Sequence, residues 1–168
     1  MEGHIGEILN PIQGLPDVEL VSASDADPAK MAKLAPSIKR YADYRQMLET
    51  ERLDVVAIGG SNGQRAEVIL ACAARKLHVA AEKPLAIERA DLERIRQAVG
   101  QSGIHLTMLL PMRFSAPYLA MKQVVESGQI GEVGQIDAQK SYKLGSGRPG
   151  CFAGPASAAL FLISESTW

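Results

Sequence analysis

Short apolar runs alternate with longer segments of helical periodicity along most of this chain. Each of the apolar runs is short and mostly apolar, as a strand buried on both faces must be. Strands are predicted at Val18–Ser24, Asp54–Gly59, Leu77–Ala80 and Ile104–Leu109. Helices are predicted at Pro28–Ala35, Tyr44–Arg52, Gln64–Arg75 and Glu88–Gly100. The alternation predicts an α/β protein with a doubly wound parallel sheet covered by helices.

The pattern changes after the last of these strands. Prolines punctuate a crossing segment, a helix is predicted at Ala116–Ser127, and Glu132–Lys143 is predicted to be a long strand of another domain. We place the boundary near Ser115. The chain is therefore expected to contain one domain over residues 1–115 and the start of a second α/β domain over residues 116–168.

Composition narrows the classes of partner. The 168 residues are 46% apolar, enough for a sizeable core, and the net charge of −1 comes from interspersed acids and bases. This balance argues against nucleic acid or a membrane surface, so a small molecule is the expected partner. Cys72 and Cys151 suggest neither a metal site nor a disulfide, which fits a cytoplasmic protein. We expect neither a signal peptide nor a membrane-spanning helix.

A glycine motif stands at the start of the chain. Gly3, His4, Ile5 and Gly6 precede a short helical pattern, and Asp25 follows about 20 residues further on, at the end of a predicted strand. In a dinucleotide-binding fold the glycines allow close approach to the pyrophosphate, and the acid binds the adenosine ribose. Alone, these residues are typical of turns and caps, but their spacing favours a dinucleotide site. The first glycine of G-x-G-x-x-G and the strand before it are missing.

Two further loops follow predicted strands. Ser61 and Asn62 come after Asp54–Gly59, where a small polar loop can line a cofactor or simply turn into a helix. Glu82 and Lys83 follow the next strand. A lysine at this edge can donate to a substrate hydroxyl and stabilise a developing alkoxide, although most loop lysines are only solvated.

A resemblance to a known family bears on these alternatives. The run His78–Ala86, HVAAEKPLA, resembles the signature of the glucose-fructose oxidoreductase/inositol dehydrogenase (Gfo/Idh/MocA) family, and the segment Ser127–Val133 agrees with it in order and spacing. The resemblance covers about residues 3–150. It implies a Rossmann-type domain followed by an α/β domain often used for oligomerisation, and NAD(P)-dependent oxidation of a hydroxyl on a sugar, cyclitol or related compound.

The resemblance also implies roles for individual residues. It implies that Gly3-His4-Ile5-Gly6 form the phosphate loop and that Asp25 binds the adenosine ribose. It implies that Ser61 and Asn62 lie beside the nicotinamide ribose and that Glu82 and Lys83 are the signature pair. It also implies that Arg113 closes the cofactor cleft. Lys83 corresponds to the family's usual catalytic lysine. The chain departs from the family at Arg65, where many relatives have His, and it has no His after His105 to accept the hydroxyl proton.

Two functions remain open at this stage. One is an NAD-dependent dehydrogenase, with NADP as a possible cofactor and a sugar-like substrate, which forms a homo-oligomer at full length. The other is a truncated dinucleotide-binding protein without catalytic activity. Because the strand before the glycine loop is missing, we expect its neighbours to carry unpaired backbone groups and the isolated chain to be marginally folded.

Overall fold

The computed structural model describes residue 12, residues 14–139 and the backbone of residues 160–165. The chain divides into two compact units, Met1–Leu109 with Ala156–Trp168, and Leu110–Pro155. The division falls a few residues before the predicted boundary near Ser115. The described residues 160–165 group with the first unit. No helix in the described part of the chain is long and apolar enough to cross a membrane.

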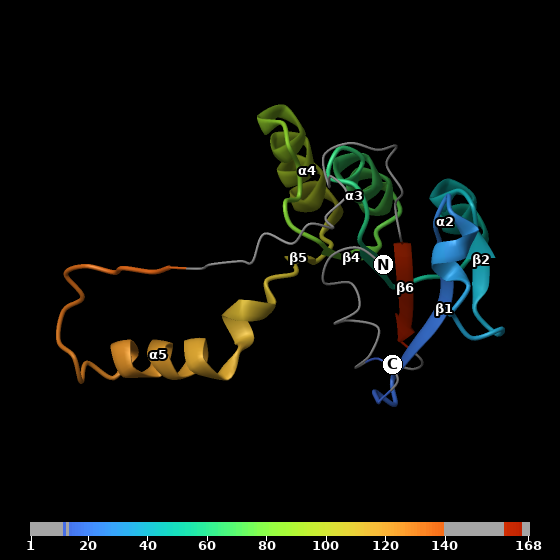
Figure 1. Cartoon of the computed structure of the whole chain (residues 1–168). Helices are drawn as coiled ribbons and strands as arrows, with labels where there is room; N and C mark the ends of the chain where they lie inside the picture. Colours follow the sequence, from blue (N-terminus) through green and yellow to red (C-terminus); the bar gives the residue numbers. More distant parts are fainter. Residues whose placement is uncertain (1–11, 13, 140–159, 166–168) are drawn as a thin grey trace, which may run out of the picture. The chain divides into compact units, whose positions relative to one another are not determined.

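The first unit is built on a six-stranded sheet with the order β2-β1-β6-β3-β4-β5 (Figure 1). Its strands are β1 (Val18–Ser24), β2 (Lys39–Tyr41), β3 (Val55–Ile58), β4 (His78–Ala81), β5 (Leu106–Met108) and β6 (Leu160–Glu165). β1 pairs in parallel with β2, and β4 pairs in parallel with both β3 and β5. The predicted α/β class with parallel strands is therefore confirmed.

The centre of the sheet differs from the prediction. β6 lies between β1 and β3 and is antiparallel to both, with Phe161 in register with Ala23 on one side and Ala57 on the other. The prediction of unpaired backbone groups on β1 and β3 was wrong because residues 160–165 pair with both strands. β6 begins at the edge where β1 and β3 end, so its direction is opposite to that of a strand leading into a glycine loop.

Helices cover the face of the sheet on which Val56 and Ile58 are buried. They are α2 (Tyr44–Thr50), α3 (Arg65–Ala74) and α4 (Arg89–Ser102). Asp43 caps α2, where its side chain accepts from the backbone N–H of Arg45 at 2.8 Å. α4 continues through Gly100, the predicted end, and stops at Gly103, whose φ of 73° is the left-handed conformation that ends many helices.

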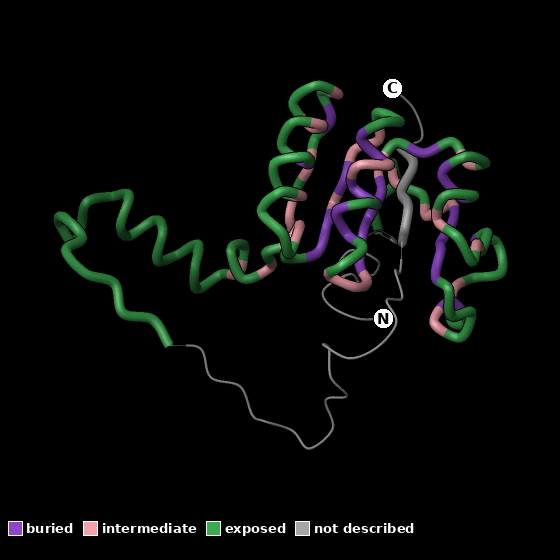
Figure 2. Tube along the Cα trace, turned by 90° about the horizontal axis from the view of Figure 1, so that it is seen from above, coloured by how far each residue is buried: buried purple, intermediate pink, exposed green. Residues whose placement is uncertain are grey.

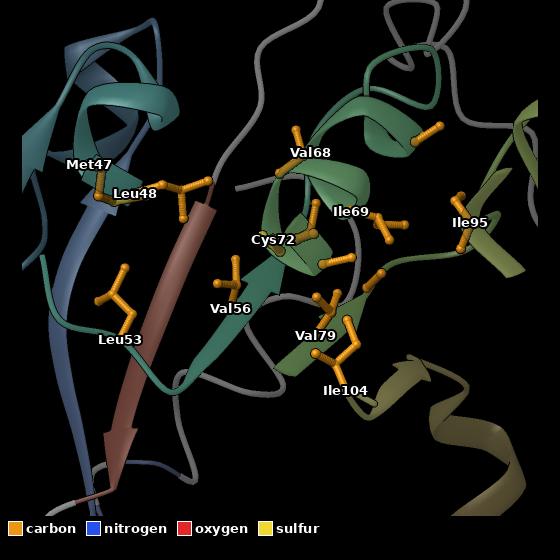
Figure 3. Packing of buried hydrophobic residues seen from close by; sticks show 14 residues of the cluster. Met47, Leu48, Leu53, Val56, Val68, Ile69, Cys72, Val79, Ile95 and Ile104 are labelled. Carbon is orange, nitrogen blue, oxygen red and sulfur yellow. The ribbon is translucent and has the colours of Figure 1, made fainter. Parts of the chain in front are cut away.

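The main core lies between these helices and the sheet. Val56, Val68, Ile69 and Cys72 are fully buried there and lie close together in Figure 3. Ala57, between Val56 and Ile58 on β3, belongs instead to a smaller cluster with Met31. Successive residues of a strand point to opposite faces, so β3 is buried on both sides, as the unbroken apolar run predicts (Figure 2).

The short helix η1 (Pro28–Met31) contributes Met31 to the second cluster. Asp27 caps it, accepting from the backbone N–H of Ala29 at 3.0 Å. The predicted helix over Pro28–Ala35 is wrong in length and type, since only one 3₁₀ turn forms. Pro36 follows the predicted helix and disfavours helical geometry at Ala35, the residue before it.

The second unit contains the 3₁₀ helix η2 (Pro111–Phe114) and the helix α5 (Ala116–Glu126). α5 has no buried residue (Figure 2). The strand predicted at Glu132–Lys143 does not form over residues 132–139, and its remainder lies outside the described residues. A strand is defined by its hydrogen-bonded neighbour, and no described segment pairs with this one.

Candidate functional site

Polar side chains follow three strands of the sheet at the point where each ends. Asp25 follows β1, the loop from Gly59 to Asn62 follows β3, and Glu82 with Lys83 follows β4. These strands run in one direction, so their carboxyl ends lie at the same edge of the sheet, where ligands bind in open α/β folds. The structure therefore brings five of the sequence-predicted residues to one edge.

Asp25 is buried, with 1% of its surface exposed. One carboxylate oxygen, Oδ1, accepts from the backbone N–H of Asp27 at 2.9 Å, and the Asp25 N–H donates to the Tyr41 carbonyl at 3.1 Å. The other oxygen, Oδ2, is buried without a hydrogen-bond partner among the described residues. A buried carboxylate oxygen left without a donor is unfavourable, so this atom is suited to accept from a ligand hydroxyl.

The loop after β3 is held by its backbone and by α3. Gly60 has a φ of 83°, a conformation that favours glycine. The Ser61 hydroxyl is buried without a partner in the described part of the chain. The Asn62 side chain accepts from Arg65 at 3.1 Å through its oxygen Oδ1. The loop therefore combines a fixed turn with two polar side chains.

Arg65 connects this loop to the loop after β4. It is 3% exposed and donates to the Gly60 carbonyl at 2.8 Å, to Asn62 Oδ1 and to the Pro84 carbonyl. Burial lowers the pKa of its guanidinium, while the negative charge of Glu82 opposes that shift. The sequence analysis noted Arg65 only as a departure from the family. Its helical spacing from the buried Ile69 and Cys72 was a signal that it faces inward.

The loop after β4 carries the signature pair. The Glu82 N–H donates to the Ile58 carbonyl at 2.8 Å, and its buried side chain accepts from the Lys83 N–H at 3.0 Å through Oε2. The Lys83–Pro84 peptide bond is cis. Lys83 is exposed, so its ammonium stands at the surface of the sheet edge on a backbone that Glu82 anchors.

A hollow of about 410 Å³ is lined by Ser24 and Ala26, the two residues that flank Asp25 in the sequence. It is lined by the end of β1 and the first residues of α2 and α3, including Ser24, Tyr44, Arg45 and Gln64. The Arg45 guanidinium carbon lies 4.6 Å from the centroid of the Tyr44 ring, a cation–π distance. The hollow offers both a ring and polar groups next to the buried acid.

The remaining predicted site residues are not part of this edge as described. Gly3, His4, Ile5 and Gly6 lie outside the described residues. Arg113 lies in η2 of the second unit, where its N–H donates to the Leu110 carbonyl at 3.0 Å. The roles predicted for these residues stay predictions.

The sequence is similar to those of known dehydrogenases. Residues 3–109 match the Gfo/Idh/MocA family, described as "Oxidoreductase family, NAD-binding Rossmann fold". Inositol 2-dehydrogenase of Salmonella paratyphi B is 31% identical over 134 residues, which cover 77% of this chain and 39% of the relative. Myo-inositol 2-dehydrogenase of Thermotoga maritima is 28% identical over 134 residues, covering 77% of this chain and 40% of the relative.

A solved structure shows the same fold. The WlbA dehydrogenase from Bordetella pertussis, crystallised with NADH and UDP-GlcNAcA, superposes with a TM-score of 0.69 at 23% identity, covering 76% of this chain and 39% of that one. This chain therefore spans about two fifths of the length of the relatives that it matches.

Proposed function

Because this chain belongs to the Gfo/Idh/MocA oxidoreductase family, with its NAD-binding Rossmann fold, we propose that it is the cofactor-binding part of a dehydrogenase. The proposed substrate is a hydroxyl compound of the sugar or cyclitol class, in line with the inositol dehydrogenases among its relatives. The observation that carries the proposal is Oδ2 of Asp25 at the carboxyl edge of the sheet, which is buried and has no hydrogen-bond partner among the residues that the structure describes.

The residues beside Asp25 fit the adenosine end of NAD. A ribose hydroxyl is the kind of donor that the orphaned carboxylate oxygen lacks, and the hollow next to it can take the adenine against Tyr44. A phosphate on the same ribose would bring a second negative charge to a buried carboxylate. We therefore expect NAD to bind more tightly than NADP. Arg45 also lines the hollow, but it forms an ion pair with Asp43 at 3.7 Å.

Ser61, Asn62 and Lys83 would serve the nicotinamide end. The bound dinucleotide supplies a hydride acceptor at its nicotinamide ring. The Lys83 Nζ would donate a hydrogen bond to the substrate hydroxyl oxygen and stabilise negative charge that develops there during oxidation. A charged lysine is a poor base at neutral pH, so we assign it orientation and electrostatic stabilisation rather than removal of the proton.

The proposal is tested by titrating the chain with NADH and NADPH, monitored by cofactor fluorescence. Asp25→Asn should weaken NADH binding by about 10- to 100-fold, the range expected for hydrogen bonds to a charged acceptor. It should also narrow the preference for NADH over NADPH, since the repulsive charge is gone. Asp27→Asn is the matched control, because it removes the same charge two residues away at an exposed helix cap. Equal affinity for both cofactors in the parent chain, or equal losses in both variants, would refute the role of Asp25.

A further inference from the structure

Arg65 holds together the two loops on which the proposed function depends. From the first turn of α3 it donates to the Gly60 carbonyl and to Asn62 in the loop after β3, and to the Pro84 carbonyl in the loop after β4. We propose that Arg65 is a positioning residue, which fixes the Asn62 amide and the Lys83–Pro84 turn relative to each other before a cofactor binds. The part that concerns the cofactor rests on the proposed function.

The burial of Arg65 distinguishes it from the other arginines on these helices. Arg65 is 3% exposed, whereas the Arg96 side chain on α4 is 81% exposed and forms only an i,i+3 ion pair with Glu93. A buried guanidinium needs acceptors for its donors and a nearby opposite charge. Nη1 and Nη2 donate to three carbonyl-type oxygens, and the buried Glu82 supplies the opposite charge. Nε is buried without a hydrogen-bond partner among the described residues. Such an arrangement is rigid, because a planar guanidinium fixes the direction of each donor.

The contact with Arg65 also determines which half of the Asn62 amide can serve a ligand. An arginine only donates hydrogen bonds, so the atom that faces it must be the Asn62 oxygen Oδ1, 3.1 Å away. The amide nitrogen Nδ2 is then the half that remains for an acceptor. Asn62 is therefore set to donate, which suits a ribose or carboxamide oxygen.

The backbone around Lys83 is fixed on both sides. Before it, the Glu82 N–H bonds to the Ile58 carbonyl on β3, and the Glu82 side chain accepts from the Lys83 N–H. After it, the Pro84 carbonyl accepts from Arg65. Removing Arg65 would break the hydrogen bond to the Pro84 carbonyl, so the backbone that carries the exposed Lys83 ammonium would be held on one side only.

Hydrogen exchange of the cofactor-free chain tests, without any ligand, the clamp that Arg65 forms by its hydrogen bonds to Gly60, Asn62 and Pro84. In Arg65→Gln, the amides of residues 59–64, 82, 83, 85 and 86 should exchange about tenfold faster, the factor expected for losing charged hydrogen bonds. Amides of β4 and α4 should be unchanged. Arg65→Lys keeps the charge but not the planar fork, so it should loosen both loops in the same way. Arg96→Gln is the control and should leave both loops as they are. Wild-type exchange in both loops of the Arg65 variants overturns the proposal.

NADH affinity then tests whether the clamp positions groups for the cofactor. Arg65→Lys should weaken NADH binding about tenfold, and this loss should be much smaller in an Asn62→Ala background, because Arg65 acts partly through Asn62. Equal losses in both backgrounds overturn the role of Asn62. If Arg65→Gln does not fold, hydrogen exchange and NADH affinity are measured with Arg65→Lys and Asn62→Ala instead. If the parent chain binds no NADH, the proposed function fails, while the exchange data still decide whether Arg65 joins the loops.

Discussion

β6 offers a direct test of how the sheet is completed, using Phe161→Pro. Phe161 is in register with Ala23 on β1 and with Ala57 on β3, so it occupies an interior position of an interior strand. Proline removes one N–H from the ladder and leaves the opposite carbonyl buried without a donor, which costs about 1–3 kcal/mol. Its ring also disturbs the neighbouring pairs, so we expect about 3 kcal/mol in total.

The register sets an upper limit on this effect. β6 forms five register pairs with β1 and four with β3. An antiparallel ladder has about one hydrogen bond per register pair. At about 1 kcal/mol for each bond, complete loss of the pairing of β6 would lower the free energy of unfolding by on the order of 9 kcal/mol. That is comparable to the whole stability of a typical domain.

Urea unfolding followed by circular dichroism measures the change. With a denaturant slope of about 2 kcal/mol/M, a loss of 3 kcal/mol lowers the midpoint by about 1.5 M. Val133→Pro is the control, because Val133 is exposed and lies outside any helix or strand. A Phe161→Pro curve that coincides with the Val133→Pro curve would show that β6 does not support the sheet, and a variant that cannot fold at all would show the opposite.

Two further predictions concern single side chains. In a full-length protein with dehydrogenase activity, Lys83→Met should lower turnover by about a hundredfold or more with a smaller effect on cofactor affinity, measured by steady-state kinetics; normal turnover would return Lys83 to a solvated loop lysine. Burial raises the pKa of the Cys72 thiol from 9.0 to about 12, so stability should fall as pH rises above about 9, where only the unfolded thiol ionises. Cys72→Ala should lack this part of the decline in urea midpoints between pH 8 and 10, and parallel profiles would contradict the assignment.

The elements that the sequence predicted best are those with strong local signals. β1 has the predicted bounds Val18–Ser24, because a short, mostly apolar run between turn residues is typical of a strand. β3 and β4 lie within one or two residues of their predictions for the same reason. The end of α4 was misplaced because Gly100 and Gly103 are both plausible stops, and only Gly103 has the left-handed backbone.

The elements that the sequence analysis missed depend on distant partners. β2, Lys39–Tyr41, is too short and polar to form a recognisable pattern and is set by its pairing with β1. β6, Leu160–Glu165, was not predicted, because its antiparallel insertion between β1 and β3 depends on partners more than a hundred residues away in the sequence. Local periodicity carries no information about such pairing.

The features of the candidate site also divide into those that local sequence predicts and those that depend on distant partners. Asp25, Asn62 and Lys83 follow predicted strand ends, so their common edge could be inferred from topology alone. The clamp by Arg65 could not, since its three acceptors come from two separate loops. The unpartnered Oδ2 of Asp25 likewise depends on which donors the surrounding backbone supplies.

The position of β6 also determines how the chain reaches its folded state. β1 with β2, and β3 with β4 and β5, form two separate sets of paired strands, and within the described sheet only β6 pairs with a strand of each set. Pairing β6 with β1 and β3 closes loops of more than a hundred residues, which costs conformational entropy before any hydrogen bond of the ladder compensates for it. We therefore expect docking of β6 to be the slow step of folding. Until then β1 and β3 each present an open edge, and the half-formed sheet is the species most prone to aggregate.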